Sequence, residues 1–143
     1  MEKKKVAIVT LGDSRREFYK KREAIVASEI EKVKKAFGDK YDLYISPIVF
    51  DTEDGQNISD EIKRQGIEAV IIHVPIWATP SLAFRIAYGT SYPVLLLGNL
   101  QRNTSSLVHC WQLGVCWTRP ERSASVYLVI MKIHRSRKRW ITL

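Results

Sequence analysis

The chain has 143 residues, of which 45% are hydrophobic and 27% charged, which fits one globular domain with a buried core. No apolar run approaches the roughly 18 residues of a membrane-spanning helix, and the apolar run 6–11 has no signal-peptide cleavage site behind it, so we expect a cytoplasmic protein without a membrane partner. The net charge of +8 suggests an anionic partner, but residues 1–108 hold 16 Lys and Arg against 14 Asp and Glu, whereas residues 109–143 hold 7 against 1. The basic character therefore belongs to residues 109–143.

One strand and one helix are predicted at the start of the chain. Residues 5–11 (KVAIVTL) are a β-branched apolar run typical of a buried strand. Apolar residues at helical spacing then predict one amphipathic helix over residues 15–37. We expect Asp13 or Ser14 to cap the start of this helix, and Gly38 to end it in the left-handed conformation.

The second strand and helix have a less regular pattern. Residues 43–50 (LYISPIVF) are a strand candidate, although Pro47 fits only an edge strand or a bulge. Residues 51–55 are expected to form a turn-rich loop, and a short helix is expected over residues 58–65, ending at Gly66.

The third and fourth strands have the most apolar sequences. Residues 69–74 (AVIIHV) and 92–97 (YPVLLL) are predicted to be buried strands. Between them, residues 79–80 (Thr-Pro) are a helix-start signal, a cap followed by proline at the first helical position, for a helix over residues 81–88. Residues 104–108 have the pattern of a further helix start.

Strands and helices alternate along the chain, and the strands are continuously apolar. This pattern predicts a Rossmann-like, three-layer α/β domain, with a mostly parallel sheet of four or more strands and helices on both faces. Ligands of such sheets bind beyond the carboxyl ends of the strands. Four segments should therefore meet at one edge of the sheet: residues 12–16, 50–57, 75–80 and 98–106.

Charged residues follow the first two strands. Arg15 and Arg16 could hold a hydroxylated or anionic ligand through the planar guanidinium fork, although composition alone favours a solvated first helical turn with a capping Asp. The glycine spacings of dinucleotide-binding and Walker motifs are absent. Asp51, Glu53 and Asp54 could bind a hard cation, but we favour a polar turn fixed by Asp and Gly.

Two residues of the third strand and its exit have competing interpretations. We expect His73 to be packed and hydrogen-bonded rather than a metal ligand, because no Asp, Glu or Cys lies at ligand spacing from it. Trp77 follows the strand just before a capped helix, where its aromatic face suits the C–H groups of a sugar. A core or interface tryptophan is an equally good interpretation of Trp77.

The carboxyl-terminal segment carries both cysteines and a basic cluster. Five residues separate Cys110 from Cys116, beside His109, whereas structural zinc sites prefer two to four intervening residues and a second ligand pair. We therefore expect neither a metal site nor a disulfide framework. Residues 135–140 (RSRKRW) could contact phosphates, but no nucleic-acid-binding motif accompanies them, and we do not expect a nucleic-acid partner.

Four segments, in this order and spacing, resemble the N-terminal domain of the L-fucose isomerase and L-arabinose isomerase family over residues 4–108. They are KVAIVTLGDSRREFYKKRE, the loop DTEDGQ, AVIIHVPIWATPS and VLLLGNLQRNTSSLV. The resemblance implies a substrate-recognition domain for a small sugar. In it, Arg15, with Arg16 as the alternate, would donate hydrogen bonds to sugar hydroxyls, and Trp77 would cover the apolar face of the sugar.

The resemblance also implies what the rest of such an enzyme supplies. The family interconverts aldoses and ketoses through a metal-stabilised enediol, with Mn²⁺ held by Glu, Asp and His of a later domain, and it works as a homo-oligomer. Nothing in this sequence matches those ligands, so we assign no metal ligand and no catalytic residue, and we expect this chain alone to be an inactive, truncated relative. The alternative is a stand-alone α/β module that binds a sugar or another polar ligand.

The family pattern stops after residue 108, where HCWQLGVCWTRP begins. When the third base of each codon is joined to the first two bases of the next, His-Cys and Cys-Trp both specify Leu, Trp-Gln specifies Ala, and Trp-Thr specifies Asp. The shifted reading LLAVGGVLDQ would continue a helix, so we hypothesise that residues 109–143 are an out-of-frame, non-native basic tail, which the nucleotide sequence tests. Within it, residues 125–133 (SVYLVIMKI) are either an added edge strand or an exposed aggregation segment, and we favour the latter.

Overall fold

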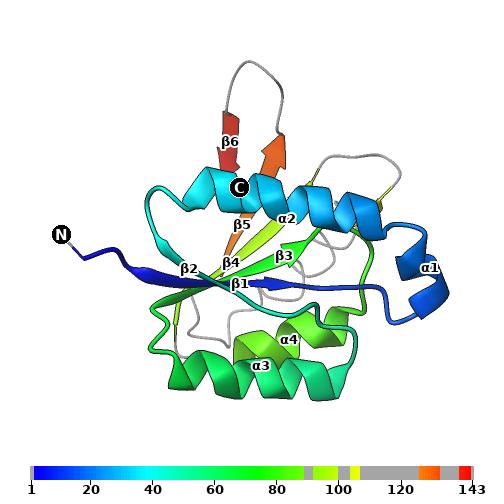
Figure 1. Ribbon diagram of the computed structural model, residues 1–143, viewed down its shortest axis with the longest axis horizontal. Coiled ribbons are helices and arrows are strands. Elements are labelled where there is room, and N and C mark those ends of the chain that lie inside the picture. Colours follow the sequence, from blue (N-terminus) through cyan, green and yellow to red (C-terminus); the bar gives the residue numbers. More distant parts are fainter. Residues whose placement is uncertain (1, 89–91, 100–103, 107–125, 133–138, 143) are drawn as a thin grey trace.

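The structure is a computed structural model that describes residues 2–88, 92–99, 104–106, 126–132 and 139–142. Strands and helices alternate through most of the chain, as the apolar pattern predicts (Figure 1). In chain order they are β1 (Lys5–Thr10), α1 (Arg16–Lys20), α2 (Glu23–Phe37), β2 (Asp42–Ile45), α3 (Thr52–Arg64), β3 (Ala69–Val74), α4 (Pro80–Tyr88), β4 (Val94–Asn99), β5 (Val126–Lys132) and β6 (Arg139–Thr142).

The strands form one six-stranded sheet in the order β2-β1-β3-β4-β5-β6. The first five run parallel, and β6 is antiparallel to β5. Helix α2 covers one face of the sheet, and α3 and α4 cover the other (Figure 1). The predicted Rossmann-like α/β fold with a mostly parallel sheet is therefore confirmed, and its three layers are visible.

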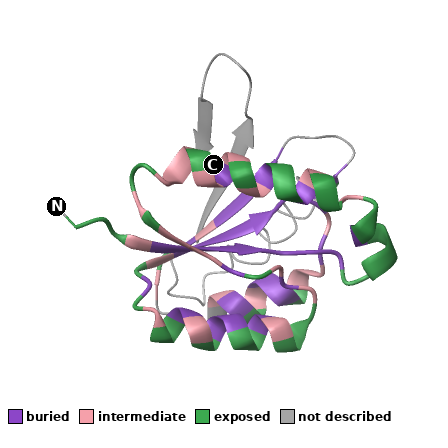
Figure 2. Cartoon of the chain, viewed as in Figure 1, coloured by how far each residue is buried: buried purple, intermediate pink, exposed green. Residues whose placement is uncertain are grey.

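Both faces of the sheet are buried at β1, β3 and β4, which explains why the sequences of these strands are continuously apolar (Figure 2). Alternate residues of β1 point to opposite faces: Val9 packs in the cluster that includes Ile62 and Ile86 of the lower helices, whereas Ile8 packs in the cluster with Val33 of α2. Each fully buried Ile or Leu contributes roughly 1.5–3 kcal/mol relative to an exposed side chain. The core therefore holds β1 and β3 rigidly at the centre of the sheet.

The single helix expected over residues 15–37 is divided in two. Helix α1 ends at Lys20, and α2 begins at Glu23, with Arg22 between them at φ −120° and ψ 3°. Neither helix start has a side-chain cap, so the expectation that Asp13 or Ser14 caps the helix was wrong. The expectation for Gly38 was also wrong, because its φ of −62° is ordinary right-handed backbone.

The second strand and helix also differ from their predicted bounds. Strand β2 ends at Ile45, before Pro47, and the chain returns to β1 only at an isolated bridge between Leu11 and Val49. The expected loop over residues 51–55 is instead the start of α3, because Asp51 caps it by accepting a hydrogen bond from the backbone N–H of Asp54 at 2.9 Å. Gly66 follows the end of α3 and has a φ of +66°, as expected of a glycine that ends a helix.

The later elements follow the prediction more closely. Helix α4 begins at Pro80, as the Thr-Pro signal indicates, and β4 extends two residues beyond the predicted end, to Asn99. Of the helix start expected over residues 104–108, the last two residues lie outside the described residues. Val126–Lys132 forms strand β5, which pairs with β4. Of our two interpretations of residues 125–133, the added strand is therefore correct, and the exposed aggregation segment that we favoured was wrong. The hypothesis of a shifted reading frame remains a prediction.

Candidate functional site

A pocket of about 350 Å³ lies beyond the carboxyl ends of the central strands. Three of the four segments expected at this edge contribute to it: the exits of β1, β3 and β4. Residues of α1 and of the turn that follows it close its outer side. The lining residues are Asp13, Arg15, Phe18, Arg22, Ile76, Trp77, Thr104 and Ser105.

Asp13 and Arg15 form a two-pronged ion pair in this pocket. The Nε of Arg15 donates to Oδ1 of Asp13 at 2.9 Å, and an Nη donates to Oδ2 at 2.8 Å. The backbone N–H of Arg15 donates to the same Oδ1 at 3.0 Å. The carboxylate is 3% exposed, and its two oxygens therefore hold the guanidinium plane in one orientation.

The ion pair keeps Asp13 ionised. Burial alone would raise the pKa of Asp13, but hydrogen bonds from Arg15 and the positive charges of Arg15 and Arg22 outweigh it, so the pKa is lowered from its ordinary value of 3.8. The same hydrogen bonds raise the pKa of Arg15. At neutral pH the pocket therefore holds one carboxylate and two guanidinium groups.

Two aromatic rings flank the Arg15 guanidinium. Its central carbon lies 4.5 Å from the ring centroid of Phe18 and 4.9 Å from that of Trp77, both within cation–π range. Trp77 is half-buried, and its backbone N–H donates to the carbonyl of Thr104 at 2.8 Å. The site thus combines a fixed planar cation with apolar ring surface, which is the chemistry that hydroxylated ligands with C–H faces require.

Helix α1 is fixed in place by a small apolar cluster. Tyr19 is buried, and its ring meets that of Phe50 edge to face, with centroids 4.7 Å apart. Ile76, which immediately precedes Trp77, is packed in the same cluster with Val26. A helix of only five residues is marginal by itself, so this packing is what holds the aromatic and basic side chains of α1 beside the exit of β3.

A buried hydrogen-bond network shapes the β4 exit. Asn99 donates from its amide nitrogen to the carbonyl of Pro75 at 2.6 Å and accepts from the hydroxyl of Thr104 at 3.0 Å. The hydroxyl of Ser106 donates to the carbonyl of Val74. Between them, Ser105 is exposed and has a φ of +56°, in the left-handed region that a non-glycine residue rarely adopts. The network therefore presents Ser105 at the rim of the pocket.

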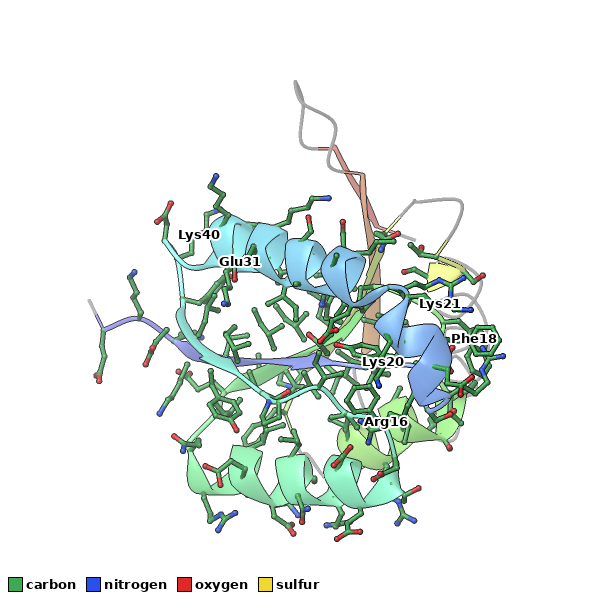
Figure 3. All side chains as sticks on the ribbon, turned by 45° about the vertical axis from the view of Figure 1, so that its right-hand side comes forward. Arg16, Phe18, Lys20, Lys21, Glu31 and Lys40 are labelled. Carbon is green, nitrogen blue, oxygen red and sulfur yellow. The ribbon has the colours of Figure 1, made fainter. Side chains whose placement is uncertain are left out.

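The structure separates the three residues for which the sequence indicates sugar binding. Arg15 and Trp77 lie together in the pocket, whereas Arg16 points elsewhere, with its guanidinium carbon 3.6 Å from the ring centroid of Phe50. Figure 3 shows Arg16 and Phe18 on α1. Sequence analysis missed Phe18 and Arg22, because a continuous helix over residues 15–37 would not turn Arg22 back toward the strand ends.

The remaining candidates have structural explanations. Asp54 accepts from the backbone N–H of Phe50 at 3.0 Å and Asp51 caps α3, so the acidic segment after β2 is a helix start and not the polar turn that we favoured. His73 is 2% exposed, and its Nδ1 lies 3.1 Å from the hydroxyl of Thr10, which agrees with a packed, hydrogen-bonded histidine. Burial lowers the pKa of His73 to about 3.

The described residues contain no group of side chains that could hold a metal ion. Among them, no three His, Cys, Asp or Glu side chains come together, so these residues do not fit the Mn²⁺ that the family resemblance implies. His109, Cys110, Cys116 and residues 133–138 lie outside the described ranges. We therefore derive no step through a metal ion.

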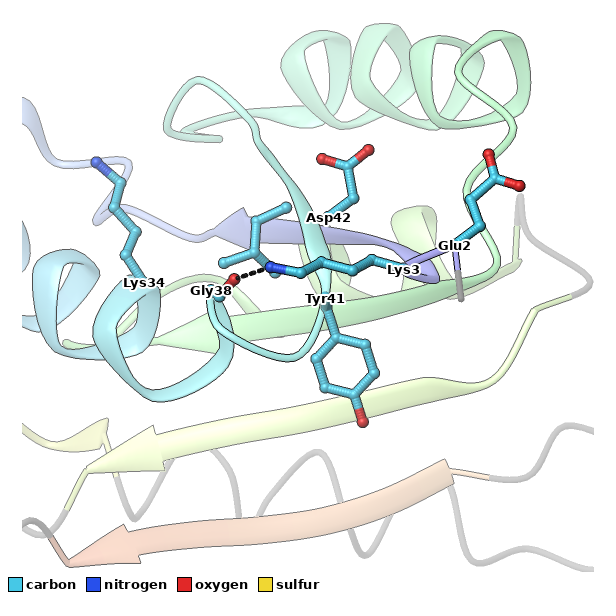
Figure 4. Close-up of a pocket in the computed structure, with 7 residues that line it drawn as sticks. Glu2, Lys3, Lys34, Gly38, Tyr41 and Asp42 are labelled. Carbon is cyan, nitrogen blue, oxygen red and sulfur yellow. Dashed lines mark hydrogen bonds between the residues drawn. The ribbon is translucent and has the colours of Figure 1, made fainter.

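A second, larger hollow of about 530 Å³ lies at the opposite edge of the sheet, beside the amino ends of β1 and β2 (Figure 4). Its charged side chains extend from the surface, and Lys3 donates to the carbonyl of Gly38 at 3.2 Å. The lining residues are Glu2, Lys3, Lys34, Gly38, Tyr41, Asp42 and Leu43. Parallel sheets bind ligands at the other edge, so the smaller pocket is the better functional candidate.

Comparisons with known proteins do not assign a function to this pocket. No protein-family model matches the chain, and no curated protein matches its sequence. The resemblance to sugar isomerases therefore remains a prediction from four short segments. Among the helices that the structure describes, none has both the length and the apolar character needed to cross a bilayer.

Proposed function

We propose that the pocket beyond the carboxyl ends of β1 and β3 binds a sugar. The observation that carries the proposal is the guanidinium of Arg15, fixed by Asp13 and placed 4.9 Å from the Trp77 ring centroid. A sugar presents hydroxyls around its edge and C–H groups on its faces, so it needs both kinds of surface in one pocket.

Arg15 supplies the directional contacts. The Arg15 guanidinium has five N–H groups. Two of them, one on Nε and one on an Nη, donate to Asp13, and the other three remain for the ligand. Because the ion pair fixes the guanidinium plane before binding, little side-chain entropy is lost when a hydroxyl replaces water there. Trp77 supplies apolar ring surface, and Thr104 and Ser105 also line the pocket.

The sugar in this proposal is the substrate of an aldose–ketose isomerase, for which this chain contributes recognition. Support comes from the segments that carry the family resemblance: three of the four provide every lining residue of the pocket. In this role Arg15 and Trp77 orient the sugar for chemistry performed in a separate catalytic domain of a homo-oligomer. Incubation of this chain with L-fucose and Mn²⁺ should yield no ketose, and turnover would contradict the assignment to binding alone.

Calorimetric titration with L-fucose and with L-arabinose tests the binding role. Arg15→Gln should weaken sugar binding by roughly tenfold, because the charged hydrogen bonds are lost. Arg16→Gln is the matched control, since it removes the same charge one residue away from a side chain that lies on Phe50. Arg15→Lys keeps the charge but not the fork and should also bind weakly. Absence of binding by both sugars, or equal losses in Arg15→Gln and Arg16→Gln, would overturn the proposal.

A further inference from the structure

Arg22 is the residue of the pocket that sugar binding does not explain. It stands between α1 and α2, lines the pocket and is half-buried. Among the described residues, no side chain or carbonyl forms a hydrogen bond or ion pair with its guanidinium. Its charge nevertheless acts on Asp13, whose pKa it helps to lower. The Arg22 side chain is thus a cation close to a carboxylate that it does not bind.

Asp13 already forms its ion pair with Arg15. Both of its oxygens accept hydrogen bonds from Arg15, one at 2.9 Å and the other at 2.8 Å, and a backbone N–H adds a third. Asp13 and Arg15 cancel in charge, and Arg22 leaves the pocket with a net charge of one positive unit. A bound anion would balance this remaining positive charge and could accept hydrogen bonds from the Arg22 guanidinium.

We propose that the pocket binds an anionic sugar derivative, one that carries a phosphate or a carboxylate, and that Arg22 binds the anionic group. This inference rests on the proposed sugar-binding function and narrows its ligand class. Arg15 and Trp77 hold the hydroxylated part of the ligand, and Arg22 holds its charged end with a planar pair of N–H donors that matches a carboxylate or phosphate edge.

The surroundings of Arg22 suit an anion. Ser105 brings a hydroxyl group to the same pocket and is held exposed at its rim by the left-handed backbone, whereas the hydroxyl of Thr104 donates to Asn99. Outside the pocket, exposed Arg16, Lys20 and Lys21 on and beside α1 (Figure 3) outnumber the exposed acids Glu17 and Glu23 and give this end of the molecule a positive surface. Such a surface raises the association rate of an anionic ligand, and the effect falls with salt.

The test compares a neutral sugar with two anionic derivatives, one a carboxylate and one a phosphate ester: arabinose, arabinonate and arabinose 5-phosphate. At one fixed ionic strength, calorimetry should show the phosphate ester binding roughly tenfold more tightly than the neutral sugar, with arabinonate between them. Arg22→Gln should reduce this ratio to about one, and Arg22→Lys should retain part of it because the charge remains. Lys21→Gln, an adjacent exposed change of equal charge outside the pocket lining, removes one charge of the positive surface and should lower the ratio far less than Arg22→Gln does.

The outcomes separate this inference from the function on which it rests. Equal affinity for all three ligands, or a charge preference that survives in Arg22→Gln, would overturn the anion site while sugar binding stands. A preference that is lost equally in Lys21→Gln would also overturn it, since the whole basic surface would then be responsible. If inorganic phosphate binds through Arg22 but no sugar binds, the anion site stands and sugar recognition fails. Thermal unfolding of each variant shows whether it remains folded.

Discussion

The two edges of the sheet differ in how their charges are held. At the amino edge the hollow is larger, about 530 Å³, but Glu2, Lys3 and Asp42 are exposed. At the carboxyl edge the pocket is about 350 Å³, and Asp13 is 3% exposed and bonded at both oxygens. Exposed charges in water interact weakly and lose side-chain entropy when they are ordered. The immobilised polar groups, and not the size of the hollow, are therefore the reason to place the candidate site at the carboxyl edge.

The largest effect should be a loss of folding stability at acidic pH, caused by His73 near the carboxyl end of β3. Its pKa is about 3 when folded, because burial disfavours the charged ring, against 6.5 when exposed. The unfolded chain therefore binds a proton that the folded chain does not between pH 6.5 and about 3, and stability falls as pH falls through that window. The loss is about 1.4 kcal/mol per pH unit, or about 3 kcal/mol at pH 4.

Urea unfolding at a series of pH values measures this loss. His73→Gln keeps a hydrogen-bonding group for Thr10 but does not titrate, so its unfolding free energy should lack this part of the slope. The stabilisation from Asp13 belongs to a lower window: its folded pKa lies below 3.8, so its contribution is present above 3.8 and is lost as pH falls through the folded value. Identical slopes in the two proteins would show that His73 is not buried as described.

The second largest difference should come from removing one carboxylate at each edge. Asp13→Ala takes away three hydrogen-bond acceptor contacts and leaves Arg15 and Arg22 without a counter-charge, which should lower the free energy of unfolding by about 2 kcal/mol. Asp42→Ala at the exposed amino edge should change it by less than about 0.5 kcal/mol. Chemical denaturation of the two variants in parallel measures both, and comparable losses would remove the distinction between the edges.

The smallest effect should be a change in sugar affinity when one aromatic side chain is removed from either hollow. Trp77→Ala should weaken binding of L-arabinose by roughly fivefold to tenfold, because a sugar loses the apolar ring surface. Tyr41→Ala, which removes an aromatic side chain from the amino-edge hollow, should leave the affinity unaltered. Titration calorimetry distinguishes the two, and an effect of Tyr41→Ala alone would move the candidate site to the other edge.

Local sequence signals predicted the elements best where one residue type has one structural meaning. Pro80 begins α4, because its ring fixes φ near the helical value, and Gly66 adopts a positive φ, because glycine has no Cβ that would clash there. The helix break before Arg22 had no such signal, because its residues continue the helical spacing. Asp51 was read as part of a turn, although the same side chain serves equally as a helix cap.

The sequence by itself determined the alternation of strands and helices as far as β4, and it placed Arg15 and Trp77 soon after two buried strands. Apolar periodicity and backbone restrictions act over a few residues, so they can be read along the chain. Only the tertiary structure decided that Arg15 rather than Arg16 meets Trp77, and that Arg22 joins them. Those distances depend on the pairing of β1 with β3, in which Thr10 stands opposite His73, and on the packing of Tyr19 against Phe50. Such contacts join residues far apart in the sequence, and burial of the whole core selects them.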